Sequence, residues 1–289
     1  MRILKYTVTD EYDGFKLEDY LIKAHGFSRR IITKLKQKRG FITLNAEHIR
    51  MVDLIRCNDE IAVTFEDVPH LSQNSSLVVP VVYEDDDIIV FNKPADMPVH
   101  PSGKHQSDTL ANVFAYLSAQ KGENHIFRPI NRLDRDTTGL CVVAKNALVA
   151  ATLWKSIEKE YTAIACGYVI PDEGKIDAPI YRPDECFTKR VVDDRGKRAI
   201  TNFTVVKRMN NYTLLCIKLE TGRTHQIRVH FANMGFPLAG DSMYGGSTSD
   251  IKRQALSCTK VRFLHPITKK NVYLCINIPE DMRKLVENE

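Results

Sequence analysis

The sequence predicts an α+β protein, with a small N-terminal module followed by a larger domain in which helices flank a mixed, largely antiparallel β-sheet. Residues 17–40 show helical apolar spacing, residues 69–79 are polar and rich in Ser and Asn, and β-rich segments dominate from Pro80 onward. We therefore expect a module over residues 1–68, a linker over 69–79 and a domain over 80–289.

Composition narrows the class of protein. The chain has 289 residues, 43% hydrophobic and 27% charged, as in ordinary globular domains. No run approaches the ~18 apolar residues of a membrane-spanning helix, and the N-terminus lacks the apolar run of a secretory signal, so we expect a cytoplasmic protein without membrane contact. The seven cysteines form no CxxC pair, which favours reduced core thiols and no metal site.

The N-terminal module is expected to contain two helices and a short β-segment. Apolar residues at helical spacing indicate the first helix: Leu17, Tyr20, Leu21 and Ala24. Ser28 is a typical N-cap for a second helix, which Gly40 would close. The segment FITLN then predicts a strand.

The second helix carries charge of a single sign. No acidic residue occurs between Leu21 and Ala46, whereas the same window holds seven basic residues: Lys23, Arg29, Arg30, Lys34, Lys36, Lys38 and Arg39. A solvated helix face is the ordinary explanation of a charge run, but it predicts mixed signs. The run therefore favours contact with phosphate groups.

The larger domain is expected to be rich in strands. Segments such as DIIVFNK, TGLCVVAK, TAIACGYVI, QIRVHF and KVRFLHP contain many Val, Ile, Tyr and Phe residues, and residues 209–211 predict a hairpin turn between two further strands. Two helices are predicted, over residues 109–120 and 146–160. No GxGxxG or GxxxxGK[ST] motif occurs, so a nucleotide cofactor has no support.

Three polar clusters combine charged residues with Gly and Pro near the predicted strands. They cover residues 92–103, 131–140 and 220–245. A purely structural loop uses Gly, Asn and Ser and has little need of Arg, Asp and His between apolar positions. The three clusters are therefore candidates for a functional site.

In the second cluster, one residue separates Arg132 from Asp134. In extended chain the two side chains point to the same side, while Leu133 points toward a core. A carboxylate held near an arginine can serve as a nucleophile or base. The alternative is a structural ion pair that ties down a loop.

In the third cluster, Gly222 and Arg223 are expected to form a turn, and the polar and apolar residues of 225–230 alternate as in a strand. Arg228 lies between two apolar residues and would be partly buried. A buried arginine requires an anion, and Asp134 is a candidate partner.

These clusters, in this order, resemble the RluA-type pseudouridine synthases. The resemblance rests on NKPADMPVHP, NRLDRDTTGLCVVAKN, KEYTAIACGYV, GKRAITNF, TGRTHQIRVHFANMGFPLAGDSMYGG and LHPITKK, and it covers nearly all of residues 80–278. The N-terminal module resembles the S4 RNA-binding domain through FKLEDYLIKAHGFSRRIITKLKQKRGFITLN and RCNDEIAV.

The resemblance implies an isomerase that converts uridine to pseudouridine in RNA with no cofactor. Asp134 matches the catalytic aspartate, Tyr161 the tyrosine that stacks on uracil, and Arg228 the basic residue that pairs with the aspartate. Arg132 matches the arginine that enters the RNA stack where the target uridine is flipped out. The further residues expected to bind RNA are Arg29, Arg30, Lys34, Lys36, Arg223 and His225.

Two positions depart from the family pattern. Asn131 stands where the family usually has His, and Asp96 stands where it often has Gly. Asparagine can still orient a loop through hydrogen bonds, so we expect Asn131 to have an orienting role. Asp96 removes backbone freedom from a turn and adds a charge.

Two other functions are alternatives. A glycosidase-like hydrolase could use Asp134 and Asp136 as its two carboxylates, but it leaves the other clusters without a role. A non-catalytic RNA-binding protein has only Asn131 in its favour. The expected substrate is large-subunit ribosomal RNA, with transfer RNA as the alternative, so the chain is expected to act in rRNA processing, as a monomer.

Overall fold

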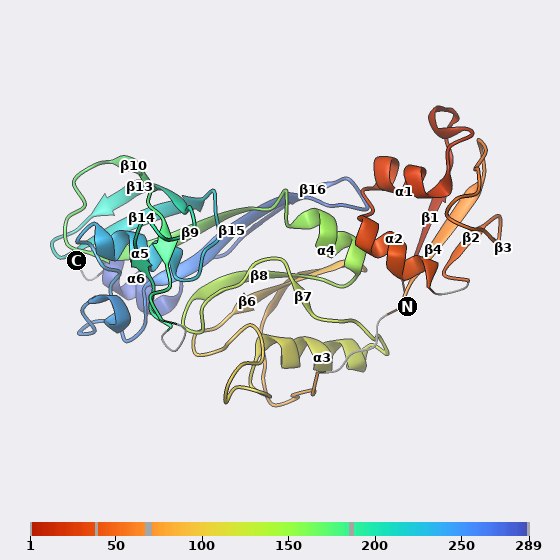
Figure 1. Cartoon of the computed structure of the whole chain (residues 1–289). Coiled ribbons are helices and arrows are strands. Elements are labelled where there is room, and N and C mark those ends of the chain that lie inside the picture. The colour runs from red at the N-terminus through yellow and green to blue at the C-terminus, as the bar shows by residue number, and fades with distance from the viewer. Residues whose placement is uncertain (1, 38–39, 67–70, 185–187, 288–289) are drawn as a thin grey trace.

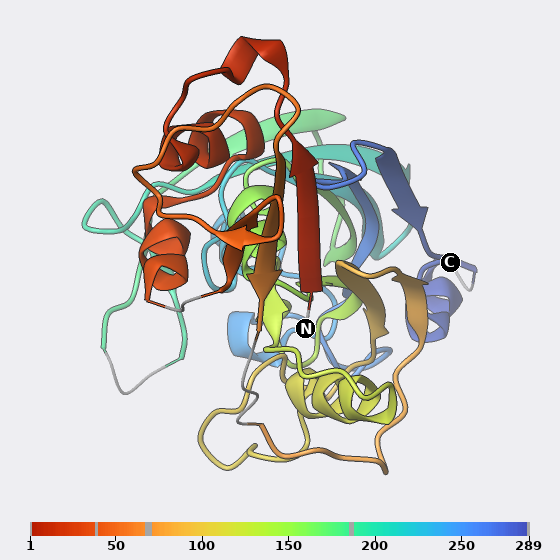
Figure 2. The same cartoon turned by 90° about the vertical axis from the view of Figure 1, so that its right-hand side faces the viewer.

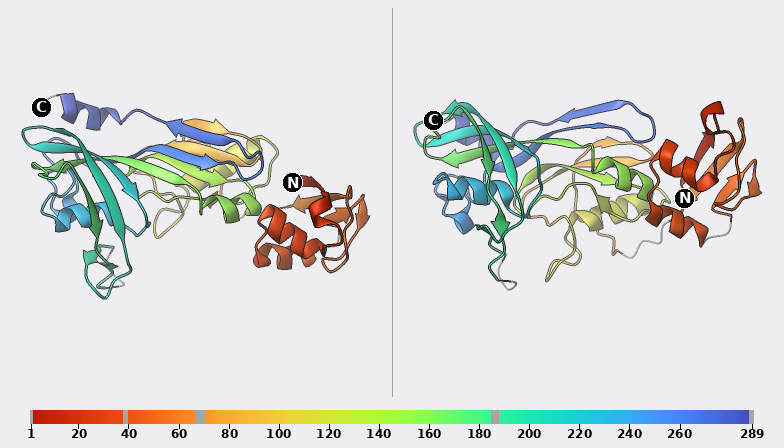
Figure 3. Two further views of the ribbon diagram at one scale, coloured as in Figure 1. Left: turned by 90° about the horizontal axis from the view of Figure 1, so that it is seen from above. Right: turned by 45° about the horizontal axis from the view of Figure 1, so that its top comes forward.

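The computed structural model describes residues 2–37, 40–66, 71–184 and 188–287. The molecule is elongated, with the N-terminal part at one end and the C-terminal helix toward the other (Figures 1 and 3). A long twisted sheet runs between them. Among the described helices, none has the length and apolarity needed to cross a membrane.

The N-terminal part is a four-stranded antiparallel sheet in the order β1-β4-β2-β3, packed against two helices. Its elements are β1 (Arg2–Thr7), a 3-10 turn η1 (Asp10–Tyr12), α1 (Leu17–His25), α2 (Arg29–Lys36), β2 (Ile42–Leu44), β3 (Glu47–His48) and β4 (Glu60–Phe65). Both expected helices and the FITLN strand are present. Helix α2 ends at Lys36 and not at Gly40, because Leu35 is the last apolar residue before Phe41 that could extend its buried face.

The large sheet contains ten strands in the described part of the chain, in the order β10-β13-β14-β9-β15-β8-β6-β5, with β16 beside β15 and β7 beside β8. All pairs are antiparallel except β8 with β15, so the expected mixed, largely antiparallel sheet is confirmed. The strands are β5 (Val81–Glu84), β6 (Ile88–Lys93), β7 (Arg128–Pro129), β8 (Thr138–Ala144), β9 (Glu158–Cys166), β10 (Glu173–Asp177), β13 (Ile200–Arg208), β14 (Tyr212–Leu219), β15 (Leu256–Leu264) and β16 (Asn271–Cys275).

Helices and short elements complete the domain. They are α3 (Leu110–Gln120), α4 (Ala147–Leu153), α5 (Gln226–Asn233), α6 (Glu280–Glu287), the 3-10 turn η2 (Ser242–Tyr244) and the small hairpin of β11 (Ile180–Tyr181) with β12 (Val191–Val192). Helix α3 and the turn at residues 209–211 agree with expectation.

Helix α4 is shorter than predicted, because residues 158–160 belong to β9. Glu158 lies 2.9 Å from Arg262 of β15, and Glu160 lies 2.5 Å from Lys260 of the same strand. These cross-strand ion pairs and the ladder between β9 and β15 favour the strand over the local helical tendency of the segment.

The expected strand at 225–230 is wrong, since this segment forms α5. Its polar and apolar residues do alternate in sequence, but six consecutive residues are all buried: Gln226, Ile227, Arg228, Val229, His230 and Phe231. The three polar side chains among them can be buried because they form hydrogen bonds with residues outside the helix. Where every position is buried, alternation along the sequence does not distinguish a strand from a helix.

The parallel contact between β8 and β15 requires glycine at position 139. Gly139 has a φ of +107°, and a Cβ there would lie 2.3 Å from the carbonyl oxygen of Cys258. Only glycine allows this approach. The contact fixes the start of β8, and therefore also the polar loop that precedes it.

The N-terminal part, which lies in front in Figure 2, contacts the large domain directly. The guanidinium of Arg2 donates two hydrogen bonds to Asp87, at 3.0 and 2.9 Å. Leu148 and Ala151 of α4 pack into the N-terminal hydrophobic core. Residues 71–79 lack regular structure, while the start of the expected linker lies outside the described residues.

Candidate active site

The loop between β7 and β8 presents Asp134 at the centre of the large sheet. Asn131 is buried, and its side chain donates to the carbonyl of Leu140 at 2.9 Å and accepts from the backbone of Val142 at 2.8 Å. Leu133 is buried, whereas Arg132 is exposed and the Asp134 side chain is 28% exposed. Asn131 therefore makes the expected orienting hydrogen bonds, and the loop points its charged residues outward.

A buried arginine joins two carboxylates at this site. Arg228 of α5 donates to Asp241 through Nε at 2.6 Å and through Nη2 at 2.8 Å, and to Oδ2 of Asp134 through Nη1 at 3.2 Å. The Arg228 side chain is 6% exposed and that of Asp241 is 1% exposed. Burial opposes the charge of Arg228, but the hydrogen bonds and charge of Asp241 outweigh it and raise the pKa of the guanidinium. The expected contact between Arg228 and Asp134 is present.

His225 and Tyr244 border the same carboxylate. Nε2 of His225 lies 3.9 Å from Oδ2 of Asp134, and Nδ1 lies 2.9 Å from the hydroxyl of Tyr244. Tyr244 also lies with its ring 5.0 Å from the guanidinium carbon of Arg228. Burial lowers the pKa of His225, even though the charge of Asp134 acts in the opposite direction.

A buried lysine ties the first polar cluster to the loop that carries Asp134. Nζ of Lys93 donates to the carbonyls of Pro94 at 2.7 Å, Met97 at 2.8 Å and Arg135 at 2.9 Å. Burial lowers the pKa of Lys93 to about 8. The sequence interpretation did not single out Lys93, although a lysine at the end of the apolar segment DIIVFNK was a usable signal.

Asp96 adopts the backbone conformation that its sequence position suggested. Its φ is +56°, a left-handed value that favours glycine. The Asp96 side chain is 81% exposed, and its carboxylate lies 3.4 Å from the guanidinium of Arg135. The added charge is thus partly balanced within the chain.

Tyr161 of β9 lies in the main hydrophobic core and is 6% exposed. Cys258 of β15 and Ile217 of β14 are its partners in the sheet. Burial raises the pKa of Tyr161 well above its ordinary value, and the negative charge of the Asp134 carboxylate acts in the same direction. Its phenol therefore stays protonated beside Asp134.

A basic hairpin lies beside the site. The segment containing β11 and β12 projects from the sheet (Figure 3), and it carries Arg182, Lys189, Arg190, Arg195, Lys197 and Arg198. Arg223 donates through Nε to the carbonyl of Arg198 at 3.0 Å, so it belongs to the same surface. Some of these charges are balanced, since Arg195 pairs with Asp193 and Arg198 with Asp177.

The basic residues of α2 are far from Asp134 in the sequence and lie in the N-terminal part. Arg29, Arg30 and Lys34 are exposed, while Ile31, Ile32 and Leu35 form the buried face. Lys36 donates to Glu18 of α1 at 2.6 Å, so its charge is paired within the chain. Lys38 and Arg39 lie outside the described residues.

Asp136 and Asp134 have different surroundings. Asp136 lies 3.4 Å from Nε of Arg135 and lines a cleft of about 1100 Å³ whose walls also include Asp96, Arg253 and Asp281. Asp134 does not line this cleft. The two carboxylates therefore do not share this cleft.

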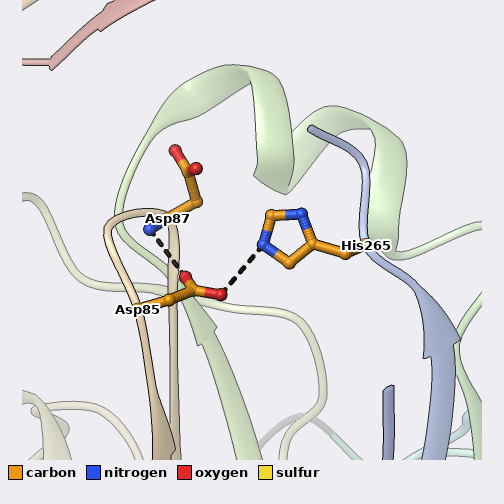
Figure 4. Close-up of side chains that lie close together, drawn as sticks. All are labelled: Asp85, Asp87 and His265. Carbon is orange, nitrogen blue, oxygen red and sulfur yellow. Dashed lines mark hydrogen bonds and ion pairs between the residues drawn. The ribbon is translucent and has the colours of Figure 1, made fainter. Parts of the chain in front are cut away.

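One group of side chains has the composition of a metal site: Asp85, Asp87 and His265 (Figure 4). Nε2 of His265 lies 3.1 Å from Oδ2 of Asp85, and Asp87 accepts hydrogen bonds from Arg2 and Asn146. Nδ1 of His265 accepts two backbone N–H groups. Because hydrogen-bond donors already occupy these ligand atoms, the group is accounted for as a structural network.

The structure adds Asp241 and Tyr244 to the residues identified from the sequence. Both lie within the third polar cluster, in LAGDSMYGG. The sequence interpretation sought one anion for the buried Arg228, and the structure provides two. A guanidinium has five N–H donors, more than one carboxylate can satisfy, so a buried arginine indicates that a second acceptor should be sought.

Comparison with known proteins shows the family to which the chain belongs. Residues 87–233 match the model of the RNA pseudouridylate synthase family. The chain is 36% identical to the uncharacterized RNA pseudouridine synthase YlyB of Bacillus subtilis, over all of this chain and 98% of the relative. It is 39% identical to ribosomal large subunit pseudouridine synthase D of Pasteurella multocida, over 79% of this chain and 76% of the relative.

Solved structures support the fold. The human RNA pseudouridylate synthase domain containing 1 protein superposes with a TM-score of 0.58 at 22% identity, covering 75% of this chain and 97% of that chain. The human domain containing 4 protein gives 0.57 at 23% identity, covering 72% and 91%. By sequence, the chain belongs to the RNA pseudouridylate synthase family and is an RNA pseudouridine synthase.

Proposed function

We propose that this enzyme uses Asp134 as its catalytic carboxylate on a uridine flipped out of structured RNA. The observation that carries the proposal is the anchoring of Asp134 by Arg228, which Asp241 holds in turn. Arg228 fixes Oδ2, and among the described residues none donates a hydrogen bond to Oδ1. One oxygen is thus held in place and the other is presented to the substrate.

The reaction suits a single positioned carboxylate. The bond between C1′ of the ribose and N1 of the uracil breaks, the base rotates, and C5 bonds to C1′ while its proton leaves to water. No electrons are gained or lost and no water is consumed. A fixed carboxylate can act on the sugar or the base as a nucleophile, or it can remove a sugar proton.

The target base must leave the RNA stack, at a cost of a few kcal/mol. Arg132 is exposed on the same loop as Asp134, two residues earlier, and we expect its side chain to fill the vacated position. The ring of Tyr161 would stack on the flipped uracil, a contact worth about 1–3 kcal/mol. The high pKa of Tyr161 keeps that ring uncharged beside the carboxylate.

The RNA is proposed to contact two basic surfaces. One is the exposed face of α2 in the S4-like module, residues 1–68, and the other is the hairpin of β11 and β12 together with Arg223. Large-subunit ribosomal RNA is the proposed substrate, supported by the 39% identity to an enzyme named for that subunit. Transfer RNA is the alternative, and the enzyme is proposed to act as a monomer.

The test of the reaction uses total RNA labelled with tritium at uracil C5, prepared from cells that lack this gene. The wild-type enzyme should release tritium to water and no free uracil, whereas Asp134→Asn should release neither. Tritium release by Asp134→Asn at the wild-type rate would show that another residue carries the chemistry. Mapping pseudouridines in cells with and without the gene identifies the RNA.

A further inference from the structure

Tyr244 lies where three segments meet beside Asp134. Its hydroxyl oxygen accepts the backbone N–H of Arg190, next to β12, at 2.9 Å. The same hydroxyl lies 2.9 Å from Nδ1 of His225, at the N-terminus of α5. Its ring covers the guanidinium of Arg228 at 5.0 Å. Contacts on its hydroxyl and on its ring therefore fix the position of Tyr244.

His225 is held just as firmly. It caps α5 in the left-handed conformation, with a φ of +57°, and its side chain is 11% exposed. Its Nε2 faces Oδ2 of Asp134 at 3.9 Å. The other charged groups that act on the ring are Arg228, Arg190 and Asp241. Burial lowers the pKa of His225, so the imidazole is neutral at neutral pH.

A neutral imidazole carries one N–H, and the surroundings select which nitrogen bears it. A proton on Nδ1 would leave the Nε2 lone pair facing the carboxylate of Asp134, which is repulsive. A proton on Nε2 places an N–H toward the carboxylate and leaves Nδ1 as an acceptor. Because the oxygen of Tyr244 already accepts from Arg190, its own hydrogen is available to Nδ1.

We propose that His225 and Tyr244 are positioning residues for Asp134. Tyr244 donates to Nδ1 and so holds His225 in the Nε2–H form, whose N–H acts with Arg228 on the same carboxylate oxygen. This assigns His225 to the orientation of the carboxylate and not to contact with RNA. The inference rests on the proposed role of Asp134 as the catalytic carboxylate.

Two substitutions at His225 separate its two nitrogens. In His225→Asn the side-chain amide reaches only the place of Nδ1, whereas in His225→Gln it reaches the place of Nε2. We expect His225→Gln to keep kcat within about tenfold, and His225→Asn to lose about 100-fold, because an imprecisely placed carboxylate reacts slowly. KM for total C5-tritiated RNA should change little in both variants.

The proton position is measured directly by ¹⁵N NMR of the imidazole rings. His225→Gln identifies the signal of His225 among the nine histidines, because that signal disappears. The wild type should show Nε2–H, and Tyr244→Phe should show a mixture of both forms together with a kcat lowered about tenfold. Tyr273→Phe, at an exposed position on the distant strand β16, is the control and should change neither.

An Nδ1–H signal in the wild type, or equal kcat for the Asn and Gln variants, would overturn the inference. If Tyr244→Phe does not fold, the wild-type NMR signal and the His225 pair still decide it. The proposed function fails separately: it falls if Asp134→Asn keeps wild-type turnover, whatever the state of His225.

Discussion

The two charged regions of this enzyme are built in opposite ways. Around Asp134, the buried guanidinium of Arg228 donates three hydrogen bonds to two carboxylates. On α2, Arg29, Arg30 and Lys34 stand in solvent above an apolar face. Reaction chemistry needs a carboxylate in one fixed place, which buried hydrogen bonds provide. Binding to phosphates gains from exposed charges that displace counterions.

Removing the charge of Asp134, the proposed catalytic carboxylate, should have the largest effect. Asp134→Asn keeps the shape of the side chain and should lower turnover at least about 1000-fold, a barrier increase of about 4 kcal/mol. RNA affinity should be almost unchanged. Tritium release and filter binding measure the two quantities, and Asp136→Asn in the same loop is the control that should retain turnover.

Asp241, the buried partner of Arg228, should matter for the stability of the fold as well as for the turnover rate. Asp241→Asn removes the buried charge that balances Arg228, and the free energy of unfolding should fall by about 3 kcal/mol. Denaturant titration followed by tryptophan fluorescence measures this change. Glu158→Gln breaks an exposed ion pair with Arg262 and should leave the midpoint unchanged. Equal losses of stability in Asp241→Asn and Glu158→Gln would contradict the difference between buried and exposed charges.

Substitutions in the exposed region should change the salt dependence of RNA affinity and not the turnover rate. Replacing Arg29, Arg30 and Lys34 together by Gln should reduce the log–log slope of RNA affinity against salt by about 2–3, at about 0.7–0.9 per phosphate contact. The rate at saturating RNA should be kept. Lys36→Gln is the matched control with a smaller effect, because Lys36 already pairs with Glu18. An unchanged slope in the triple variant would mean that α2 is only a solvated face.

Point substitutions serve this test better than deletion of residues 1–68. Deletion would expose Leu148 of α4 and leave Asp87 without Arg2. Loss of stability would then be confused with loss of RNA contact.

The buried lysine gives a pH-dependent signature. The folded pKa of Lys93 is about 8, against 10.5 for a free lysine, so between these values unfolding takes up a proton. Stability should therefore gain a contribution as pH rises from about 8 to 10.5, and it should gain none from this group below pH 8. Denaturation midpoints across that range measure it. Lys93→Met should lack the added slope, even if it is less stable throughout.

The smallest effect on turnover is expected at Asn131, one of the two positions that depart from the family pattern. The side chain of Asn131 makes two buried hydrogen bonds, both to β8, and so acts on the loop and not on the carboxylate of Asp134. Asn131→His should therefore leave turnover within several-fold of wild type in the tritium assay. A gain of a hundredfold would show that this chain is a weakened enzyme.

The sequence by itself determined the fold class, the family and the loop that carries Asp134. These features depend on short stretches of sequence, which can be interpreted without a structure. They are the composition of the strands, the helix at 109–120 and the motifs around residues 92–103, 131–140 and 220–245. The sequence also indicated that Arg228 would need an anion if it were buried, although the strand on which that burial was expected is a helix.

Only the tertiary structure decided how the site is held together. Segment 226–233 is a helix because its polar residues find partners on other elements, and sequence alternation cannot show those partners. Likewise, Lys93 bonds to Arg135 across 42 positions and Arg228 bonds to Asp134 across 94. Contacts over such separations depend on how the sheet brings its strands together, and the chain reveals them only when it is folded.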